Sequence, residues 1–175
     1  MSDFAHDRTS GSTDVGRGFL AELERWVATD TSGSAPALRQ ALLAHLRAAQ
    51  REQPSMALVH QFAARALEVA DSGLRRGDSP VELRTHLARS CAAERDDLVA
   101  STAAVVRQAR ALLTEPEAWI ATLSASRAVE DAILGAHRAG LGPRTVIAEG
   151  RPRFEGRTMA TALAAAGVPV WLVVD

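Results

Sequence analysis

The sequence contains no lysine and a single cysteine, Cys91, among its 175 residues. One cysteine excludes an internal disulfide bond and a metal site built from several cysteines, and it fits a reducing cytoplasm. Apart from the histidines, all 20 basic residues are arginines, whose planar guanidinium suits phosphate and carboxylate groups. Cys91 falls on an apolar helical stripe, which favours a buried structural thiol over a nucleophile.

An excess of positive charge and a long apolar run are also missing. The formal net charge is −1 at pH 7, which argues against electrostatic binding to nucleic acid. No stretch approaches the roughly 20 apolar residues that cross a bilayer, and the N-terminus lacks a signal-peptide pattern. The histidines share no ligand spacing, so no metal site is expected. These absences predict a cytoplasmic protein with no membrane partner and no direct nucleic-acid partner.

The first part of the chain is predicted to be helical. Residues 1–16 are rich in Ser, Gly, Asp and Thr, and we expect a disordered lead-in there. Residues 17–115 carry apolar side chains at helical spacing and form a predicted domain of four helices. Pro54 is expected to open the third helix, and Ser79 is expected to cap the fourth. The apolar stripe of the fourth helix continues to Leu112.

From residue 116 onward, short apolar strands alternate with helices. Strands are predicted at 119–123, 145–148 and 170–174, with helices at 127–139 and 155–166. This alternation favours parallel pairing through right-handed crossovers. The predicted fold class is therefore α/β: an N-terminal all-helical module, then at 116–175 the first half of a Rossmann-like parallel sheet, truncated after its third strand. That strand would be an apolar edge, which predicts a partner or a continuation over it.

Ligands of open parallel sheets bind beyond the carboxyl ends of the strands, beside the starts of the following helices. Three segments end there, and the hydroxyls, charges and helix amides of the first two suit an anion. The candidate phosphate-binding residues are Ser124, Ser126, Arg127, Glu149, Arg151 and Arg157. A plainer interpretation stays open for each segment. A serine such as Ser126 is most often a helix cap, and Glu149 with Arg151 can be a surface ion pair. Asp175 follows the third strand at the same edge.

The same segments resemble a known protein family. The stretch Thr122-Leu123-Ser124-Ala125-Ser126-Arg127-Ala128-Val129 resembles the Thr-His-Ser-x-Ser-x-x-Val stretch of the regulatory alpha, beta and delta subunits of translation initiation factor 2B. Glu149-Gly150-Arg151-Pro152, followed by Gly156-Arg157, resembles that family's Glu-x-Arg-Pro-x-x-x-Gly-(Arg/Lys) block. The superfamily also holds the methylthioribose-1-phosphate and ribose-1,5-bisphosphate isomerases. The resemblance is good from about Trp119 to Asp175 and looser in the helical region.

Departures from the family pattern bear on catalysis. In the isomerases, a cysteine and a later aspartate move a proton between adjacent sugar carbons. The resemblance puts Ser124 at the position of the cysteine, and a hydroxyl is a far poorer acid–base group than a thiol. Gln53 stands where the family has an arginine that helps to hold the substrate phosphate. The catalytic aspartate would belong to a region beyond Asp175, so no catalytic residue is assigned and enzymatic activity stays open.

The resemblance implies a regulatory protein that binds a sugar phosphate or a nucleotide and requires no cofactor. It also implies assembly into a homo- or hetero-oligomer through the sheet domain. Two alternatives stay open. The first is an aldose–ketose isomerase of a phosphorylated ribose, which would need a C-terminal half with the remaining motifs. The second is a degenerate family member that serves only as an interaction module.

Overall fold

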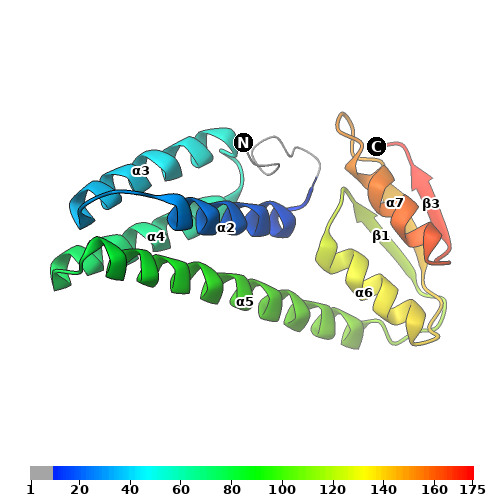
Figure 1. The fold of residues 1–175 in the computed structure, drawn as a ribbon. Helices are drawn as coiled ribbons and strands as arrows, with labels where there is room; N and C mark the ends of the chain where they lie inside the picture. Colours follow the sequence, from blue (N-terminus) through cyan, green and yellow to red (C-terminus); the bar gives the residue numbers. More distant parts are fainter. Residues whose placement is uncertain (1–9) are drawn as a thin grey trace. The chain divides into compact units, whose positions relative to one another are not determined.

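A computed structural model gives the fold of the chain and describes residues 10–175. In this part of the chain, four helices come first, and three strands then alternate with two helices (Figure 1). The order confirms the predicted fold class, a helical module followed by a parallel α/β sheet. The elements are α2 (Ser12–Thr29), α3 (Ala35–Glu52), α4 (Ala57–Arg76), α5 (Pro80–Leu112), β1 (Trp119–Leu123), α6 (Arg127–Arg138), β2 (Arg144–Ala148), α7 (Glu155–Ala165) and β3 (Val170–Val173).

The chain forms two compact units that divide within α5. The helical unit contains Ser12–Leu98, and the sheet unit contains Val99–Asp175. The change from all-helical to mixed structure falls later, between the end of α5 and the start of β1. The boundary predicted after residue 115 marks this change of structure and lies beyond the division into compact units.

Helix α2 begins at Ser12, so the expectation of a disordered lead-in over 1–16 is wrong for its last residues. Val15 is 1% exposed and belongs to the core of the helical unit. Gly16 lies so close to Leu58 and Phe62 that a β-carbon there would stand 3.0 Å from a methyl group of Leu58. Packing against α4 thus stabilises a helix in a segment whose small and polar residues favour disorder. Residues 1–9 lie outside the described part of the chain.

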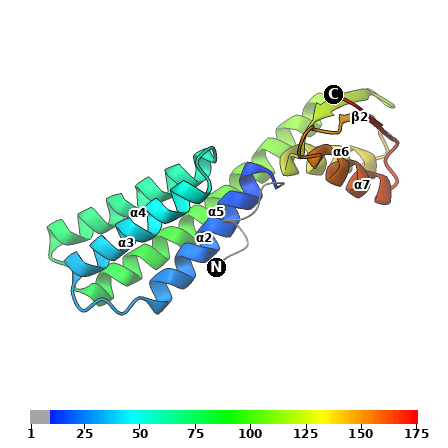
Figure 2. The same cartoon turned by 90° about the horizontal axis from the view of Figure 1, so that it is seen from above.

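The helical unit has one continuous hydrophobic core to which all four helices contribute. Figure 2 shows these helices side by side as a bundle. The largest side chains with less than 2% exposure in this core are those of Phe19, Leu20 and Leu23 on α2, Leu38, Leu42 and Leu46 on α3, and Leu83 and Leu87 on α5. Their spacing of three to four residues gives each helix one apolar face, and burial of those faces stabilises the unit.

Local signals set the ends of most of these helices. The Ser79 hydroxyl accepts a hydrogen bond from the Glu82 amide, and the Glu82 carboxylate accepts one from the Ser79 amide, which confirms the predicted cap. The third helix, however, begins at Ala57 instead of Pro54. The Met56 amide donates to the Gln53 carbonyl, so residues 53–56 form a turn before the helix can start.

Helix α5 is much longer than the helices that pack on it. Its 33 residues span about 50 Å, whereas α2, α3 and α4 have 18, 18 and 20 residues. The buried residues of α5 are Leu83, Leu87 and Cys91, all in its first half. The expectation of a core stripe reaching Leu112 is wrong, because Val105 is 52% exposed and Leu112 is 83% exposed. The shorter helices reach only part of the length of α5.

The sheet unit contains three parallel strands in the order β1-β2-β3. Because each crossover moves to the next strand in the same direction, α6 and α7 lie on the same face of the sheet (Figure 1). Ile147 in the central strand is fully buried beneath them, together with Ile133 of α6 and Leu163 of α7. This small core supports the carboxyl edge of the sheet, where the three strands end.

The opposite face of the sheet carries apolar side chains that these helices do not cover. Trp119, Leu123, Trp171 and Val173 are 58%, 73%, 46% and 42% exposed. The rings of Trp119 and Trp171 lie 4.8 Å apart, and the Arg144 guanidinium lies 5.8 Å from the Trp119 ring. Successive side chains of a strand point to opposite faces, and the strand register puts these residues on one face. We call this surface the open sheet face.

Candidate functional site

The three strands end together at one edge of the sheet. Leu123 of β1 is in register with Ala148 of β2, which is in register with Val173 of β3. Ser124 and Glu149 follow immediately on neighbouring strands, which lie about 4.8 Å apart in a sheet. The ladder continues by one hydrogen bond, since the Glu149 amide donates to the Val173 carbonyl at 2.9 Å. The predicted convergence of the candidate segments at this edge therefore follows from the register.

Glu149 is the buried centre of the second segment. The residue is 3% exposed, and its carboxylate accepts hydrogen bonds from the side chains of Arg151 and Arg157. The Arg157 nitrogens lie 3.0 and 2.7 Å from Glu149 Oε2. Hydrogen bonds from Arg151, and next from Arg157, hold the pKa of the Glu149 carboxyl below its usual 4.5. The ion pair of Glu149 with Arg151 is thus one side of a three-residue cluster, with the carboxylate inside and both guanidinium groups about half exposed.

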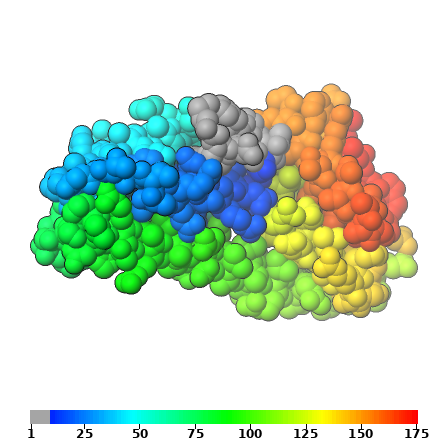
Figure 3. All heavy atoms as spheres, viewed as in Figure 1, coloured from blue at the N-terminus to red at the C-terminus, as the bar shows by residue number. Residues whose placement is uncertain are grey.

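The loop between β2 and α7 has a closely defined backbone. Gly150 adopts a left-handed conformation with φ of +76°, and so does Phe154 with φ of +59°. The Phe154 amide donates to the Gly150 carbonyl at 2.6 Å, and the Gly156 amide donates to the Glu149 carbonyl at 3.1 Å. The Arg151–Pro152 peptide bond is cis. These contacts fold residues 149–156 into a compact turn, of which residues 151–154 are exposed on the surface (Figure 3).

Glycine is required at position 156 by close packing. A β-carbon there would stand 2.0 Å from the carbonyl oxygen of Ala148, and backbone atoms cannot yield as a side chain can. The absence of a side chain lets the first turn of α7 approach the end of β2. Arg157, the next residue, is thereby brought against Glu149. Close packing therefore explains why a glycine stands directly before Arg157 in the sequence.

An aromatic ring lies beside both arginines of the cluster. The Arg157 guanidinium carbon is 4.2 Å from the centre of the Phe154 ring, and that of Arg151 is 5.9 Å away. Such cation–π contacts stabilise a partly exposed guanidinium by about 0.5–1 kcal/mol. Phe154 was not among the predicted site residues. An aromatic residue between two arginines in the sequence was the available signal.

The first segment presents hydroxyl groups at the start of α6. Ser124 has φ of +63°, an uncommon conformation for a residue with a side chain. Ser126 occupies the N-cap position in an extended conformation, but its hydroxyl makes no capping hydrogen bond. Ser126 therefore has the position predicted for a helix cap, but its side chain does not cap the helix. The Arg127 guanidinium pairs with Glu130 at 3.1 Å within the same helix, so its charge is directed along α6.

Asp175 joins the site although the sequence analysis assigned it no role. Its Oδ1 atom accepts hydrogen bonds from the Gly150 amide at 3.1 Å and from the Arg151 amide at 3.2 Å. Two consecutive amides thus converge on one carboxylate oxygen, an arrangement typical of anion-binding turns. The signal in the sequence was an acidic residue directly after an apolar strand that ends at the same edge.

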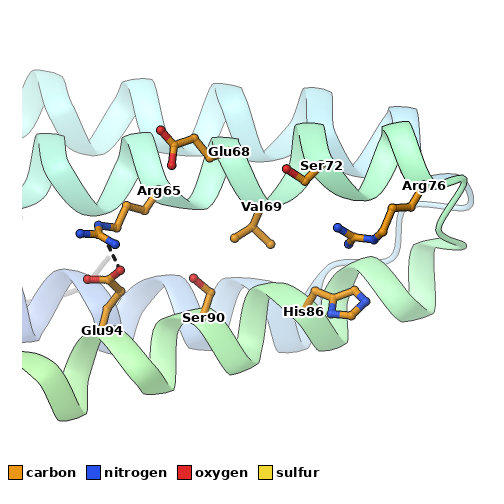
Figure 4. A pocket seen from close by; sticks show the side chains of 8 residues that line it. All are labelled: Arg65, Glu68, Val69, Ser72, Arg76, His86, Ser90 and Glu94. Carbon is orange, nitrogen blue, oxygen red and sulfur yellow. Dashed lines mark ion pairs between the residues drawn. The ribbon is translucent and has the colours of Figure 1, made fainter.

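A separate groove of about 410 Å³ lies between α4 and α5 in the helical unit (Figure 4). Both of its arginines are paired, since Arg65 contacts Glu94 at 3.2 Å and Arg76 contacts Asp78 at 2.7 Å. His86 lies 3.6 Å from the same aspartate. Basic and acidic groups alternate along the groove, so it offers no charge of one sign for a ligand. It is a weaker candidate than the sheet edge.

Cys91 does not serve as a nucleophile in this fold. The residue is 3% exposed on α5, and burial raises the pKa of its thiol to about 12. The thiolate is the reactive form of cysteine, and it is hardly populated at neutral pH with such a pKa. Within residues 10–175, no cluster of three or more metal-binding side chains occurs, and no helix is long and apolar enough to span a membrane.

Comparison with known proteins places the chain in a family. The profile described as "Initiation factor 2 subunit family" matches residues 8–175. No curated protein sequence matches the chain. Among solved structures, translation initiation factor eIF-2B of Pyrococcus horikoshii OT3 has a TM-score of 0.77 at 16% identity, covering 99% of this chain and 57% of that one.

Two further structures have the same fold. The tetrameric eIF2B-beta2-delta2 complex from C. thermophilum has a TM-score of 0.76 at 15% identity, covering 96% of this chain and 55% of that one. The 5-methylthioribose 1-phosphate isomerase from P. horikoshii OT3 has a TM-score of 0.81 at 14% identity, covering 98% of this chain and 50% of that one. The present chain thus spans about half the length of these structures. Because the family profile matches nearly its whole length, the chain belongs to the initiation factor 2 subunit family.

Proposed function

We propose that this chain is a regulatory, non-catalytic binding protein that takes a sugar phosphate or a nucleotide at the carboxyl edge of its sheet. The observation that carries the proposal is the cluster of Glu149 with Arg151 and Arg157. A buried carboxylate orients two arginine side chains that stay 54% exposed, and we propose that their outer N–H groups are available to an anion. Asp175 adds a second carboxylate at the Gly150 and Arg151 amides, so the proposal rests on the outward N–H groups of the arginines and not on a net charge.

The first segment supports the same assignment. The Ser126 hydroxyl makes no capping hydrogen bond. Ser124 directly follows β1, which pairs with β2, and Glu149 directly follows β2. The amides at the start of α6 carry the positive end of the helix dipole and suit a phosphate. In this proposal Ser124, Ser126 and Arg127 contact the ligand from the segment between β1 and the start of α6. Arg151 in the loop after β2 and Arg157 at the start of α7 contact it from the other side. Glu149 orients the arginines.

Calorimetric titration with ribose 5-phosphate and AMP tests the proposal, with unphosphorylated ribose as the ligand control. Arg151→Ala should weaken binding about tenfold to a hundredfold, because it removes a charge-assisted hydrogen bond. The helical unit should remain folded. Arg138→Ala is the matched control, since Arg138 is an exposed arginine at the opposite end of α6. Equal affinity of wild type and Arg151→Ala would remove Arg151 from the site, and absence of any binding would reject the proposal.

Isomerase activity is the second candidate, favoured by the TM-score of 0.81 to the 5-methylthioribose 1-phosphate isomerase. The chemistry argues against it for this chain. Ser124 stands at the position that resembles the isomerase cysteine, and the buried thiol of Cys91 has a pKa of about 12. We therefore expect no conversion of ribose 1,5-bisphosphate to the ketose by proton NMR. Turnover that survives repurification and is lost in Ser124→Ala would establish the isomerase instead.

Self-association through the sheet unit belongs to the same proposal. One structure with this fold is described as a tetrameric complex, and the open sheet face exposes Trp119, Leu123, Trp171 and Val173. Parallel sheets are normally covered on both faces. We propose that in the cytoplasm a second copy of this chain covers the open sheet face. Trp171→Glu should shift the sedimentation coefficient of an oligomer to that of a monomer. Self-association of the wild type without any response to a phosphorylated ligand would favour the degenerate interaction module.

A further inference from the structure

We propose that Asp175 is the positioning residue of the arginine loop: its carboxylate binds the Gly150 and Arg151 amides and thereby orients Arg151 toward Glu149 and the ligand. The inference deepens the proposed function and rests on it for its effect on ligand affinity. Its geometric part is independent of any ligand.

The third strand places Asp175 beside the loop. Ala148 is in register with Val173, and the Glu149 amide extends the ladder to the Val173 carbonyl at 2.9 Å. Asp175 lies two residues further along the chain, at the edge where the loop begins. Its Oδ1 atom then receives the Gly150 amide at 3.1 Å and the Arg151 amide at 3.2 Å. The pairing of β3 in the sheet therefore determines where Asp175 binds the backbone amide of Arg151.

The conformation of Gly150 makes this double contact possible. Its φ of +76° is left-handed, which costs glycine little and other residues more. A left-handed residue next to an ordinary one turns successive amides toward the same point, which forms a concave anion site. In this structure the anion is a side chain of the same protein, carried by a different strand. The Asp175 carboxylate thus binds the backbone amides of the loop, and the Glu149 carboxylate binds its arginine side chains.

The remaining contacts of the loop do not depend on Asp175. The Phe154 amide binds the Gly150 carbonyl at 2.6 Å, and the Gly156 amide binds the Glu149 carbonyl at 3.1 Å. Both contacts persist if the carboxylate is removed, and so does the packing of α7 on the sheet. Loss of Asp175 should therefore release the Gly150–Arg151 end of the loop while the unit stays folded. The expected consequence is a misplaced Arg151 guanidinium.

The test compares Asp175→Ala with Asp175→Asn, because asparagine keeps an Oδ1 acceptor and alanine does not. Amide hydrogen exchange followed by NMR should be about fivefold faster at Gly150 and Arg151 in the alanine variant. Ribose 5-phosphate should bind that variant about tenfold more weakly, whereas Asp175→Asn should stay within about threefold of wild type for both measurements. Glu115→Ala, which removes an exposed acid elsewhere in the unit, is the control and should change neither.

Each result separates this inference from the proposed function. Unchanged exchange at both amides in Asp175→Ala overturns the positioning role. Tighter phosphate binding in Asp175→Ala also overturns it, because it would make Asp175 a competitor of the ligand for the amides. If wild type binds no phosphate, the proposed function fails, and the exchange measurement alone still confirms or rejects the positioning of the loop by Asp175.

Discussion

The helical unit and the sheet unit bury their apolar side chains to very different extents. The core of the helical unit draws on all four helices, and Leu38, Leu42, Leu83 and Leu87 are fully buried in it. The sheet unit has a small core beneath α6 and α7, while Trp119 and Leu123 on the open sheet face are 58% and 73% exposed. Helices in a bundle can cover one another, but a parallel sheet with both crossovers on one side leaves its other face bare.

Each unit contains both paired charges and a buried polar atom without a partner among the described residues, and His45 and Glu149 illustrate the two cases. His45 of the helical unit is buried against Trp26, with ring centres 5.0 Å apart, and its Nε2 atom finds no hydrogen-bond partner among the described residues. Glu149 of the sheet unit is more completely buried, at 3% exposure, and is held by two arginines. An unpaired buried group destabilises a fold, whereas a paired one gives a defined geometry. Among residues 10–175, Glu149 is the only charged residue in the buried class, so its ion pairs mark the sheet unit as the place to look for a site.

The largest expected effect comes from two leucines that differ in burial. Leu42→Ala in the helical unit should lower the free energy of unfolding by about 3 kcal/mol, because it leaves a cavity in a packed core. Leu123→Ala on the open sheet face should cost less than about 0.5 kcal/mol. Urea unfolding measures both. Trp26 reports the helical unit when Trp119 and Trp171 are replaced by phenylalanine, and Trp26→Phe leaves the sheet unit as the reporter.

A large loss of unfolding free energy in Leu123→Ala would contradict the difference in burial between the two units. It would mean that the open sheet face is covered in solution, either by a second copy or by another chain. Repeating the measurement over a range of protein concentrations distinguishes these possibilities, since only self-association makes stability depend on the concentration of this chain.

A smaller, stabilising effect is expected within the sheet unit. Thr145 of β2 is fully buried, and its hydroxyl has no hydrogen-bond partner among residues 10–175. Thr145→Val has nearly the same shape and removes the unpaired hydroxyl, so it should stabilise the unit by about 1 kcal/mol. Thr122→Val, on the neighbouring strand and less buried, is the control with a smaller expected gain. A loss of stability in Thr145→Val would show that the hydroxyl is satisfied, for example by water.

The smallest expected effect is a difference in how the units respond to acid. Burial lowers the pKa of His45 from its usual 6.5, against a smaller upward effect of Glu22. The unfolded chain therefore binds a proton more readily than the folded one, and the helical unit should lose stability as pH falls below 6.5. Glu149 acts in a lower range, since arginine contacts hold its pKa below 4.5. Its stabilisation is complete above 4.5 and is lost only as pH falls through the lowered pKa.

Urea unfolding with the single-unit tryptophan reporters checks this order at about pH 7.5 and about pH 5.5. The helical unit should weaken between these values, and His45→Phe, which keeps a ring against Trp26, should reduce the change. The sheet unit should keep the contribution of Glu149 throughout. Equal pH dependence of His45→Phe and wild type would show that another group is responsible.

The sequence predicted the fold class and most element boundaries because local signals carry that information. Apolar residues at helical spacing gave the helices, and apolar runs between turns gave the three strands. The predictions failed where packing overrides local preference. The first residues of α2 are helical because Val15 is buried, and the second half of α5 has no fully buried residue because its partner helices are shorter.

The candidate site divides in the same way between sequence and structure. Spacing and resemblance identified Ser124, Glu149, Arg151 and Arg157 as neighbours at one sheet edge, since strand order and direction fix which loops meet. They could not show that Glu149 is buried between the two arginines or that Arg127 pairs within α6. Side-chain partners depend on exact distances, which a pattern of residue types does not contain.

By itself, then, the sequence determined the order of helices and strands and the edge at which polar residues gather, because periodicity and chain direction are local properties. Only the tertiary structure decided that Asp175 reaches the amides of Gly150 and Arg151, and that one sheet face is covered while the other is bare. The physical reason is that both depend on contacts between residues far apart in the chain, and those contacts exist only after the strands have paired in register.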